Sequence, residues 1–258
     1  MNCRILLALA LWLISLPVSA TTMLLTGAGT GVDAIGILPT FRFVWESNSV
    51  TTGSPTSPLT LPTQSIGIAN ANRFVVVAAT WDGAGLIPSV TINGVAANQS
   101  VYSPNRTGCC GPKGQGIWIS SVKVPSGATA SVAFSGWDAG QVQTLIAEVG
   151  TLRASANVGT SGIHIARAYP SGSGTITVPV ILNDEVFIGM GTVDTPTTPP
   201  AEIFWQGITV DNQIDDGQLN GLTGIIGHMP VTDDVTMNIA NAPGLGNWGW
   251  VGVTYNKQ

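Results

Sequence analysis

Two stretches decide the fold: residues 73–82 read RFVVVAATWD, and residues 185–194 read EVFIGMGTVD. The first is a continuous apolar run, short enough to be a strand that is buried on both faces. The second has the same length and, like the first, ends in a hydrophobic residue followed by Asp. These runs predict a buried strand in each half of an all-β chain.

Further strand-like segments follow the first run. Residues 89–95 alternate and contain Asn93-Gly94, a pair favoured in tight hairpin turns because both positions tolerate positive φ. Residues 117–124 alternate, residues 130–134 follow after a Pro-Ser-Gly turn, and residues 143–149 supply another strand. The first half therefore contains four or five predicted strands.

The second half repeats this order. Residues 205–210 correspond to 90–95, residues 221–241 align with 116–136 without a gap, and residues 250–254 correspond to 145–149. The agreement predicts a degenerate duplication. A half of four or five strands cannot cover its apolar face alone, so we expect one jelly-roll-like antiparallel β-sandwich formed by two pseudo-repeated halves.

The predicted organisation has five parts. They are a signal peptide or hydrophobic N-terminal segment (1–20), an N-terminal arm and first strand (21–70), a first β half (71–150), a connection (151–175) and a second β half (176–258).

Composition limits the classes of function. Of 258 residues, 44% are apolar and only 9% are charged, which is opposite to the balance of a disordered chain. The net charge of −5 and the scattered Lys and Arg residues argue against nucleic-acid binding and against adhesion to anionic lipids. Neutral polar surfaces are typical of secreted, filament-forming and virion proteins.

The N-terminus resembles an export signal. Arg4 precedes an apolar run over residues 5–16, and small residues end the segment at Ala20. The run is too short to span a bilayer, so we expect cleavage, an extracellular location and no membrane contact afterwards. Two alternatives are a retained anchor and a true start at Met23 instead of Met1.

Cys109 and Cys110 are adjacent and would remain after cleavage. Neighbouring cysteines cannot form an unstrained disulfide, so the chain is not a disulfide scaffold. A strained vicinal bridge, a bond to another subunit and two free thiols stay open, and the sequence does not choose among these redox states.

The segments RFVVVAATW, SVTINGVAANQS, VKVPSGATASVAFSGW and LIAEVGTL, which begin at residue 73 and end at residue 152, resemble a β-sandwich module. This module occurs in structural proteins of phages and prophages and in secreted adhesin-like bacterial proteins. The resemblance extends through residue 253 and implies structural or attachment roles, with other copies or other virion and surface proteins as partners. It carries no active-site signature.

Tryptophans next to predicted loops are candidate binding residues. Trp81 and Trp137 precede Asp82 and Asp138 at predicted strand ends, and Trp248 and Trp250 are two apart, so they point to one face of a strand. Such rings can stack on a host-surface glycan or anchor a partner subunit. The competing interpretation is that they fill the core.

Asp211, Asp215 and Asp216 are candidate Ca²⁺ ligands, because a hard cation takes several oxygen ligands from one loop. The spacing does not fit a helix–loop–helix Ca²⁺ site, and a solvated turn is the favoured interpretation of these residues. We predict no other cofactor.

Catalytic signatures are weak. The Gly-x-Ser-x-Gly motif is absent, His228 lies in a predicted strand where packing is expected, and Glu46, Glu148 and Glu202 are scattered. We therefore expect a non-catalytic protein displayed on a surface. It is either a virion component (tail, fibre or capsid decoration) or an extracellular adhesin-like component, and the alternative is a secreted carbohydrate-binding or glycan-cleaving protein.

Overall fold

The computed structural model describes residues 41–83, 89–103, 115–153, 158–168, 173–178, 185–194, 203–206, 208–217, 222–231, 235–241 and 248–257. The chain divides into two units, Met1–Ala34 and Ile35–Gln258, and all described residues belong to the second. The predicted signal segment, both adjacent cysteines and the possible start at Met23 lie outside them. Every regular element in the described part is a strand, and every pairing is antiparallel, which confirms the predicted all-β class.

Residues 41–153 form two sheets. The first inner sheet has the strand order β1 (Arg42–Thr51), β9 (Thr144–Arg153), β3 (Phe74–Asp82), β7 (Gln115–Lys123) and β6 (Asn98–Ser103). The first outer sheet has the order β2 (Leu59–Ser65), β8 (Thr129–Ser135), β4 (Ser89–Ile92) and β5 (Val95–Ala96).

Residues 158–257 also form two sheets. The second inner sheet has the order β10 (Val158–Ala168), β17 (Trp248–Lys257), β12 (Glu185–Asp194), β15 (Leu222–Val231) and β14 (Thr209–Asp215). The second outer sheet has the order β11 (Ser173–Val178), β16 (Val235–Asn241) and β13 (Ile203–Gln206).

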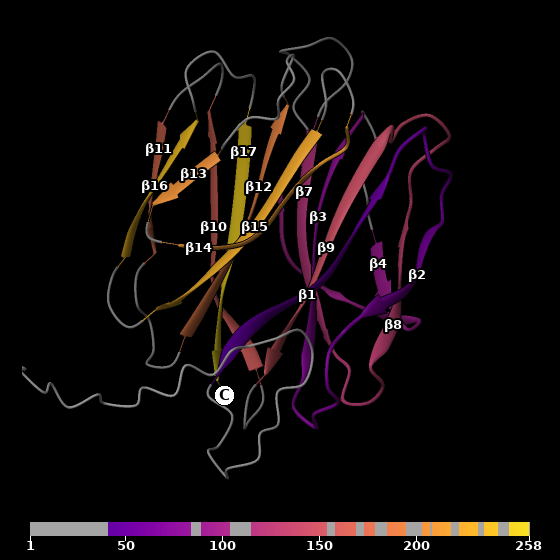
Figure 1. Ribbon diagram of the computed structural model, residues 1–258, viewed down its shortest axis with the longest axis horizontal. Helices are drawn as coiled ribbons and strands as arrows, with labels where there is room; N and C mark the ends of the chain where they lie inside the picture. Colours follow the sequence, from indigo (N-terminus) through magenta and orange to yellow (C-terminus); the bar gives the residue numbers. More distant parts are fainter. Residues whose placement is uncertain are drawn as a thin grey trace, which may run out of the picture. The chain divides into compact units, whose positions relative to one another are not determined.

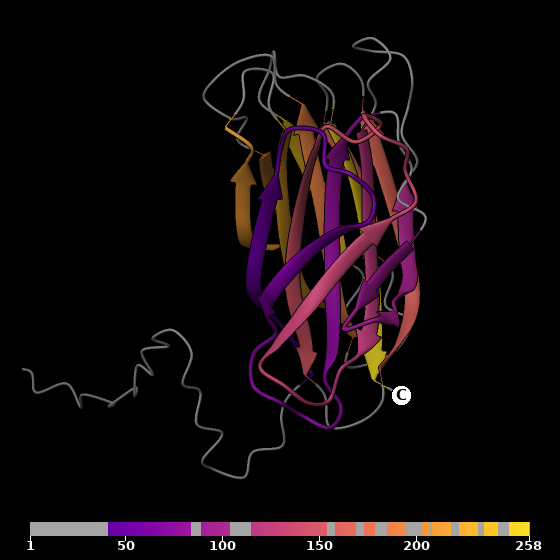
Figure 2. The same ribbon diagram turned by 90° about the vertical axis from the view of Figure 1, so that its right-hand side faces the viewer.

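The four sheets form successive layers within the described residues. Figure 1 shows, from left to right, the second outer, second inner, first inner and first outer sheets, and Figure 2 looks onto the first outer sheet. The two inner sheets contact each other, with β3 against β12 and β7 against β17. The expected single sandwich, made by stacking one sheet from each half, differs from this arrangement because each half contains enough strands to cover an apolar face by itself.

The additional strands come from segments whose composition hid them. β1 and β2 lie in the stretch predicted mainly as an N-terminal arm, and β10 lies in the predicted connection. β2 contains Pro62 and a register shift between Leu61 and Gln64, so its apolar alternation is interrupted. Edge strands tolerate such interruptions because one side of their backbone forms no ladder.

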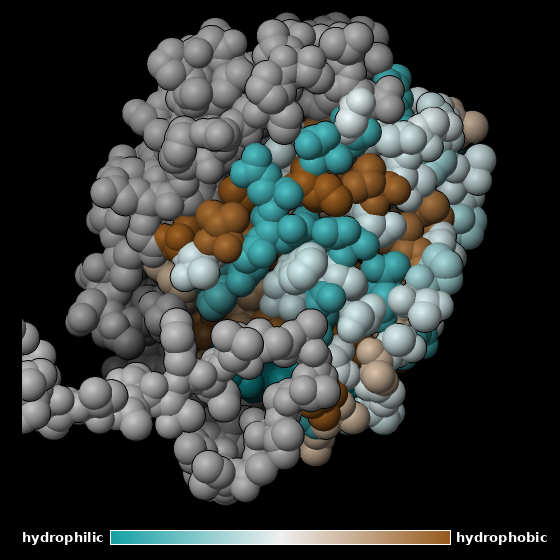
Figure 3. All heavy atoms as spheres, in the orientation of Figure 1, coloured by the Kyte–Doolittle hydropathy of each residue, from teal (hydrophilic) through white to brown (hydrophobic). Residues whose placement is uncertain are grey.

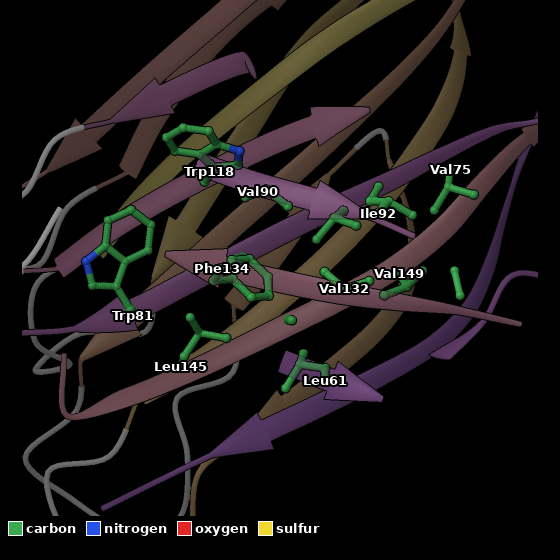
Figure 4. Close-up of a cluster of buried hydrophobic side chains, with 14 of the residues drawn as sticks. Leu61, Val75, Trp81, Val90, Ile92, Trp118, Val132, Phe134, Leu145 and Val149 are labelled. Atoms are coloured by element: carbon green, nitrogen blue, oxygen red, sulfur yellow. The ribbon is translucent and has the colours of Figure 1, made fainter. Parts of the chain in front are cut away.

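The first core lies between the first inner and first outer sheets. Leu61 and Val132 point into it from the outer sheet, and Val75, Leu145 and Val149 point into it from the inner sheet (Figure 4). All five are at most 4% exposed. The alternating burial of β8, whose even-numbered residues from 130 to 134 are buried, is the pattern of a strand with one face toward solvent.

The second core lies between the two inner sheets. Val76 and Ala78 of β3 face Ile188 and Met190 of β12 across it. Since odd-numbered residues of β3 face the first core and even-numbered ones face the second, the strand is buried on both faces. This explains why residues 73–82 form a continuous apolar run, as the sequence predicts.

Local chemistry fixes two further features. Asn93 and Gly94 have φ values of 50° and 75° between β4 and β5, which confirms the predicted tight turn. Gly116 lies under the Trp81 ring, and a Cβ at this position would overlap the indole.

The buried side chain of Arg73 connects two loop segments at one end of the first half through hydrogen bonds to their backbone carbonyls. Its guanidinium is fully buried and donates hydrogen bonds of 2.8–3.0 Å to the carbonyl oxygens of Ile66, Gly67, Val124, Ser126 and Gly127. Burial lowers the pKa of Arg73, while Glu46 raises it and Arg153 lowers it further. These carbonyl acceptors satisfy a charged group that would otherwise be costly to bury.

Candidate functional site

A buried carboxyl group connects the two inner sheets. Glu148 of β9 is fully buried, and its two oxygens accept hydrogen bonds from different sheets. Trp45 Nε1 of β1 donates to Oε2 at 2.8 Å, and Asn212 Nδ2 of β14 donates to Oε1 at 2.8 Å. Glu148 therefore joins the first inner sheet to the second through side-chain hydrogen bonds.

An acid–imidazole pair lies beside this bridge. His228 Nδ1 of β15 is 2.8 Å from Asp211 Oδ2 and 2.9 Å from Asp211 Oδ1. The His228 ring also packs against Phe43 of β1, with ring centroids 5.5 Å apart. We call Trp45, Glu148, Asp211, Asn212 and His228 the Glu148 cluster.

A bulge in β14 brings two polar side chains of the cluster to one face. The register against β15 shifts between Val210 and Asn212, so Asp211 is the extra residue. Successive residues of a regular strand point to opposite faces, but here Asp211 bonds His228 while Asn212 bonds Glu148. Without the bulge, one of these two contacts would be lost.

A second bulge, in β1, separates the cluster from a neighbouring ion pair. The register against β9 shifts between Trp45 and Ser47. Trp45 bonds Glu148 on one face, whereas Glu46 forms a 3.0 Å ion pair with Arg153 and accepts a bond from Thr151. Ser47 bonds Gln64 and the carbonyl of Ser65 of β2. Glu46 thus belongs to the side of β1 that faces the first outer sheet.

The surroundings of Glu148 favour its protonated form. Burial raises the pKa of Glu148 from 4.5 to about 7, the hydrogen bonds from Trp45 and Asn212 lower it, and the negative charge of Asp211 raises it. Because the carboxyl has no exposed surface, a substrate cannot touch it while the sheets are packed. A proton is the species that this group can take up or release.

The cluster lies on one flank of the contact between the inner sheets. We call this side the polar flank; here β1 and β9 lie against β14 and β15. We call the opposite side the apolar flank; there β6 and β7 lie against β10 and β17. Figure 3 shows hydrophilic residues in a band across the face where Figure 1 places β14 and β15. Asp211 and His228 reach the surface with 11% and 24% of their side chains exposed.

The tryptophans predicted as binding residues lie in the core wherever their side chains are described. Trp81 is 0% exposed, Trp137 is 5% exposed with Nε1 donating to the Pro55 carbonyl at 3.0 Å, and Trp250 is 1% exposed and stacked on Phe187. The side chain of Trp248 is outside the described part. Such burial agrees with the core-filling interpretation and leaves these three rings no open face for a sugar.

The two aspartates predicted beside them are placed differently. Asp82 ends β3, and its carbonyl accepts a bond from the Gln143 amide. Asp138 is exposed and forms a local turn with Gln141, whose side chain bonds both its amide and its carboxyl. Neither aspartate converges on the Glu148 cluster.

The predicted Ca²⁺ ligands do not converge either. Asp211 pairs with His228, Asp215 accepts a bond from the Gly217 amide, and the Asp216 amide bonds the Leu222 carbonyl. Among the described residues, no group of three or more His, Cys, Asp and Glu side chains is placed to hold a metal ion.

Sequence reasoning missed Glu148 as part of a site. It lies in TLIAEVGTL, residues 144–152, as the single charged residue of a stretch that is otherwise apolar or small. A charge within a strand that is buried on both faces requires partners, and that is the signal that points to it. Its partners lie 103 and 64 residues away along the chain, so the sequence alone does not identify them.

Within the described ranges, no helix has the length and apolar character required to cross a membrane. Comparisons of this chain with family models, curated proteins and solved structures found no match.

Proposed function

We propose that this protein is a non-catalytic structural or attachment protein that is displayed on a surface and associates with other copies of itself. The surface is that of a virion, as a tail, fibre or capsid-decoration component, or that of a cell, as an adhesin-like component. The observation that carries the proposal is a contrast among the edges of the four sheets.

The four edge strands of the inner sheets are all interrupted by bulges. Register shifts occur in β1, β6, β10 and β14, whereas the pairings among the inner strands of these sheets are regular. Bulges at edges hinder pairing with another chain. β2 is interrupted by a bulge and Pro62, and β5 has two residues.

The edge strand β11 lacks these protections. Its six residues, Ser173–Val178, pair with β16 in unbroken register and include no charge and no proline. Uncharged strands rich in Thr, Ile and Val favour edge-to-edge pairing. Antiparallel pairing of β11 with β11 of a second copy would place only uncharged residues opposite each other, so no charge repulsion opposes it. Among the described edge strands, β13 is also regular but has four residues.

A neutral exterior supports the same proposal. The four strands of the first outer sheet contain no charged residue. Their outward positions include Thr60, Thr91, Thr129, Ser131 and Ser135. Surfaces of this kind can approach one another closely because no like charges oppose each other.

We further infer that the chain is a tandem of two jelly-roll-like halves. In each half the strands pair as a nested series, first with last: β1 with β9, β2 with β8 and β3 with β7, then β10 with β17, β11 with β16 and β12 with β15. A jelly roll is such a long hairpin wound into two sheets, and it occurs in viral capsid and lectin domains. That association concerns the fold, and function still depends on the surface.

The contact between the halves supports duplication as well. At the centre of the contact, β3 lies against β12. The contact of β7 with β17 has a counterpart in the contact of β9 with β15, and the contact of β6 with β10 has a counterpart in the contact of β1 with β14. Such reciprocal contacts are those of a two-fold interface between equivalent units. Bulges also occur at equivalent edges, in β1 and β10 and in β6 and β14.

Sedimentation velocity over a range of protein concentrations tests self-association. We expect the wild-type protein to associate, and the double variant Thr175→Lys, Thr177→Lys to remain monomeric because lysines at an edge repel a second copy. The matched control, Thr60→Lys with Thr129→Lys, adds the same charge to the first outer sheet and retains association. A wild-type protein that stays monomeric, or a control that behaves like the β11 variant, contradicts the proposal.

Intact-mass measurement of the native protein decides between the two surfaces. A mature N-terminus at Thr21 supports export and a cell-surface role, whereas a start at Met23 supports a virion component assembled in the cytoplasm. A glycan-array signal from a monomeric protein would instead favour the carbohydrate-binding alternative.

A further inference from the structure

We propose that Glu148 forms a pH-sensitive contact between the two halves: it holds the polar flank closed when protonated and loosens it when ionised. This contact does not depend on the proposed self-association, because it lies within a single chain.

The position of Glu148 makes its charge important for the contact. Its carboxyl accepts one hydrogen bond from its own sheet, through Trp45, and one from the opposite sheet, through Asn212. Both bonds are 2.8 Å long, and the carboxyl is fully buried. A change of charge on Glu148 therefore acts where the two inner sheets meet.

The groups that face Glu148 do not compensate a negative charge. From β14, Asp211 adds a second carboxylate, and from β15, His228 is already paired with Asp211. From β3, the residue opposite is Ala78, and from β1 it is Asn48. Glu46 and Arg153 form an ion pair with each other beyond the β1 bulge. Among the described residues, ionised Glu148 thus has a like charge nearby, and the imidazole beside that charge is already hydrogen-bonded to it.

The coupling between protonation of Glu148 and opening of the polar flank gives the direction in which pH shifts the equilibrium. Burial raises the pKa of Glu148 to about 7, and opening the flank to water returns the pKa toward 4.5. The closed form therefore binds the proton more tightly than an open form does, so ionisation favours opening. With these two values, the ratio of open to closed forms rises roughly 70-fold from pH 5 to pH 8 if opening fully solvates the carboxyl.

The opposite flank does not share this response. Val253 of β17 occupies the position equivalent to Glu148. Glu148 pairs with Asn48, which is the second residue pair after the bulge in β1. Val253 pairs with Ile163, which is the second residue pair after the bulge in β10. Val253 packs in the second core with Ile119 and Val251. Loosening is therefore confined to the polar flank, and the apolar flank keeps the halves together.

The Trp45 indole N–H is the direct probe, because it donates to Glu148. Measured by nuclear magnetic resonance on the full-length protein, its shift should titrate with a midpoint near pH 7. After correction for intrinsic exchange, its protection from hydrogen exchange should fall by up to roughly 70-fold between pH 5 and pH 8. In Glu148→Gln, which has one acceptor oxygen in place of two, the shift should stay constant and the protection should not change between pH 5 and pH 8.

Asp138→Asn is the control, since Asp138 is exposed and bonded to Gln141, and it should leave the Trp45 titration unchanged. A second measurement uses the wild-type protein alone, with carbon-13 in the carboxyl groups of its four glutamates. A Glu148 carboxyl signal that titrates near pH 4.5 overturns the proposal. So does Trp45 protection that is equal at pH 5 and pH 8, or that still falls with pH in Glu148→Gln.

Discussion

The two flanks of the contact between the inner sheets both include bulged edge strands, β1 and β14 on one flank and β6 and β10 on the other, but their described side chains differ. On the polar flank, Glu148 is bonded to Trp45 and Asn212, and Asp211 is bonded to His228. On the apolar flank, the described hydrophobic side chains that pack in the second core are Ile117, Ile119, Val158, Val251, Val253 and Tyr255, and β7 also contributes the buried Ser121.

This difference between the flanks means that one interface can combine contacts whose strength is independent of pH with a contact whose strength depends on pH. Apolar contacts hold two sheets together independently of pH, because their strength depends on the area removed from water. A buried carboxyl contributes a free energy that changes with its protonation. Variants that exchange or remove these features test the comparison, and the largest effect is expected where a charge is placed on the apolar flank.

Val253→Glu places a carboxyl at the position equivalent to Glu148 but without hydrogen-bond donors prepared for it. We expect a loss of about 3–5 kcal/mol in the free energy of unfolding at pH 8, because an unpaired charge is buried. Val253→Ala, which leaves a cavity without a charge, should cost about 2 kcal/mol. Equal losses for the two variants, measured by urea unfolding, would show that water reaches the apolar flank.

The stability of the wild-type protein should fall as pH rises. The pKa of Glu148 is about 7 in the folded state and 4.5 in the unfolded state, so the folded protein binds the proton more tightly. The stabilisation is fully present below pH 4.5 and is lost as pH rises through 7, by about 3 kcal/mol at most. Urea unfolding of wild type and Glu148→Gln at pH 5 and pH 8 measures the difference, and a variant with the same pH dependence as the wild type would assign the effect to another group.

Asn212→Ala removes the donor that reaches Glu148 from the opposite sheet. At pH 8 we expect a loss of about 1–3 kcal/mol, because an ionised acceptor is left with one partner fewer. The loss should be smaller at pH 5, where the carboxyl is neutral. Thr209→Ala, at an exposed position of the same strand, is the control and should be nearly neutral at both pH values.

His228→Asn should have the smallest effect, about 1 kcal/mol or less, because its pair with Asp211 is partly exposed and screened by salt. The loss should shrink in 0.5 M NaCl, which separates the ion pair from the packing of His228 on Phe43. A loss that is large and independent of salt would mean that packing on Phe43 is the main contribution of His228.

Several features of the fold could be predicted because they depend on local sequence. The Asn93-Gly94 turn follows from the tolerance of both residues for positive φ. The burial of β3 on both faces follows from its unbroken apolar run. In contrast, β2 and β10 are edge strands with interrupted or polar sequences, so periodicity did not separate them from an arm or a connection, and the first strand expected within residues 21–70 was not placed more closely.

The site could not be predicted in the same way. Core filling was the favoured interpretation for Trp81, Trp137 and Trp250, but the sequence did not exclude binding, since an aromatic at a strand end has the same sequence pattern in both cases. Asp211 and Asn212 attract attention as part of an acidic stretch, but the bulge that turns both toward the first inner sheet depends on pairing with β15.

The sequence by itself determined that this chain forms sheets, where its doubly buried strand lies and that its exterior is nearly neutral, because these properties depend on neighbouring residues and composition. Only the tertiary structure decided that the chain forms four sheets whose two five-stranded members pack against each other, and that Glu148 lies between those two. The cost of burying a charge depends on the groups around it. Those groups come from strands far apart in the chain and become neighbours only when the sheets pack.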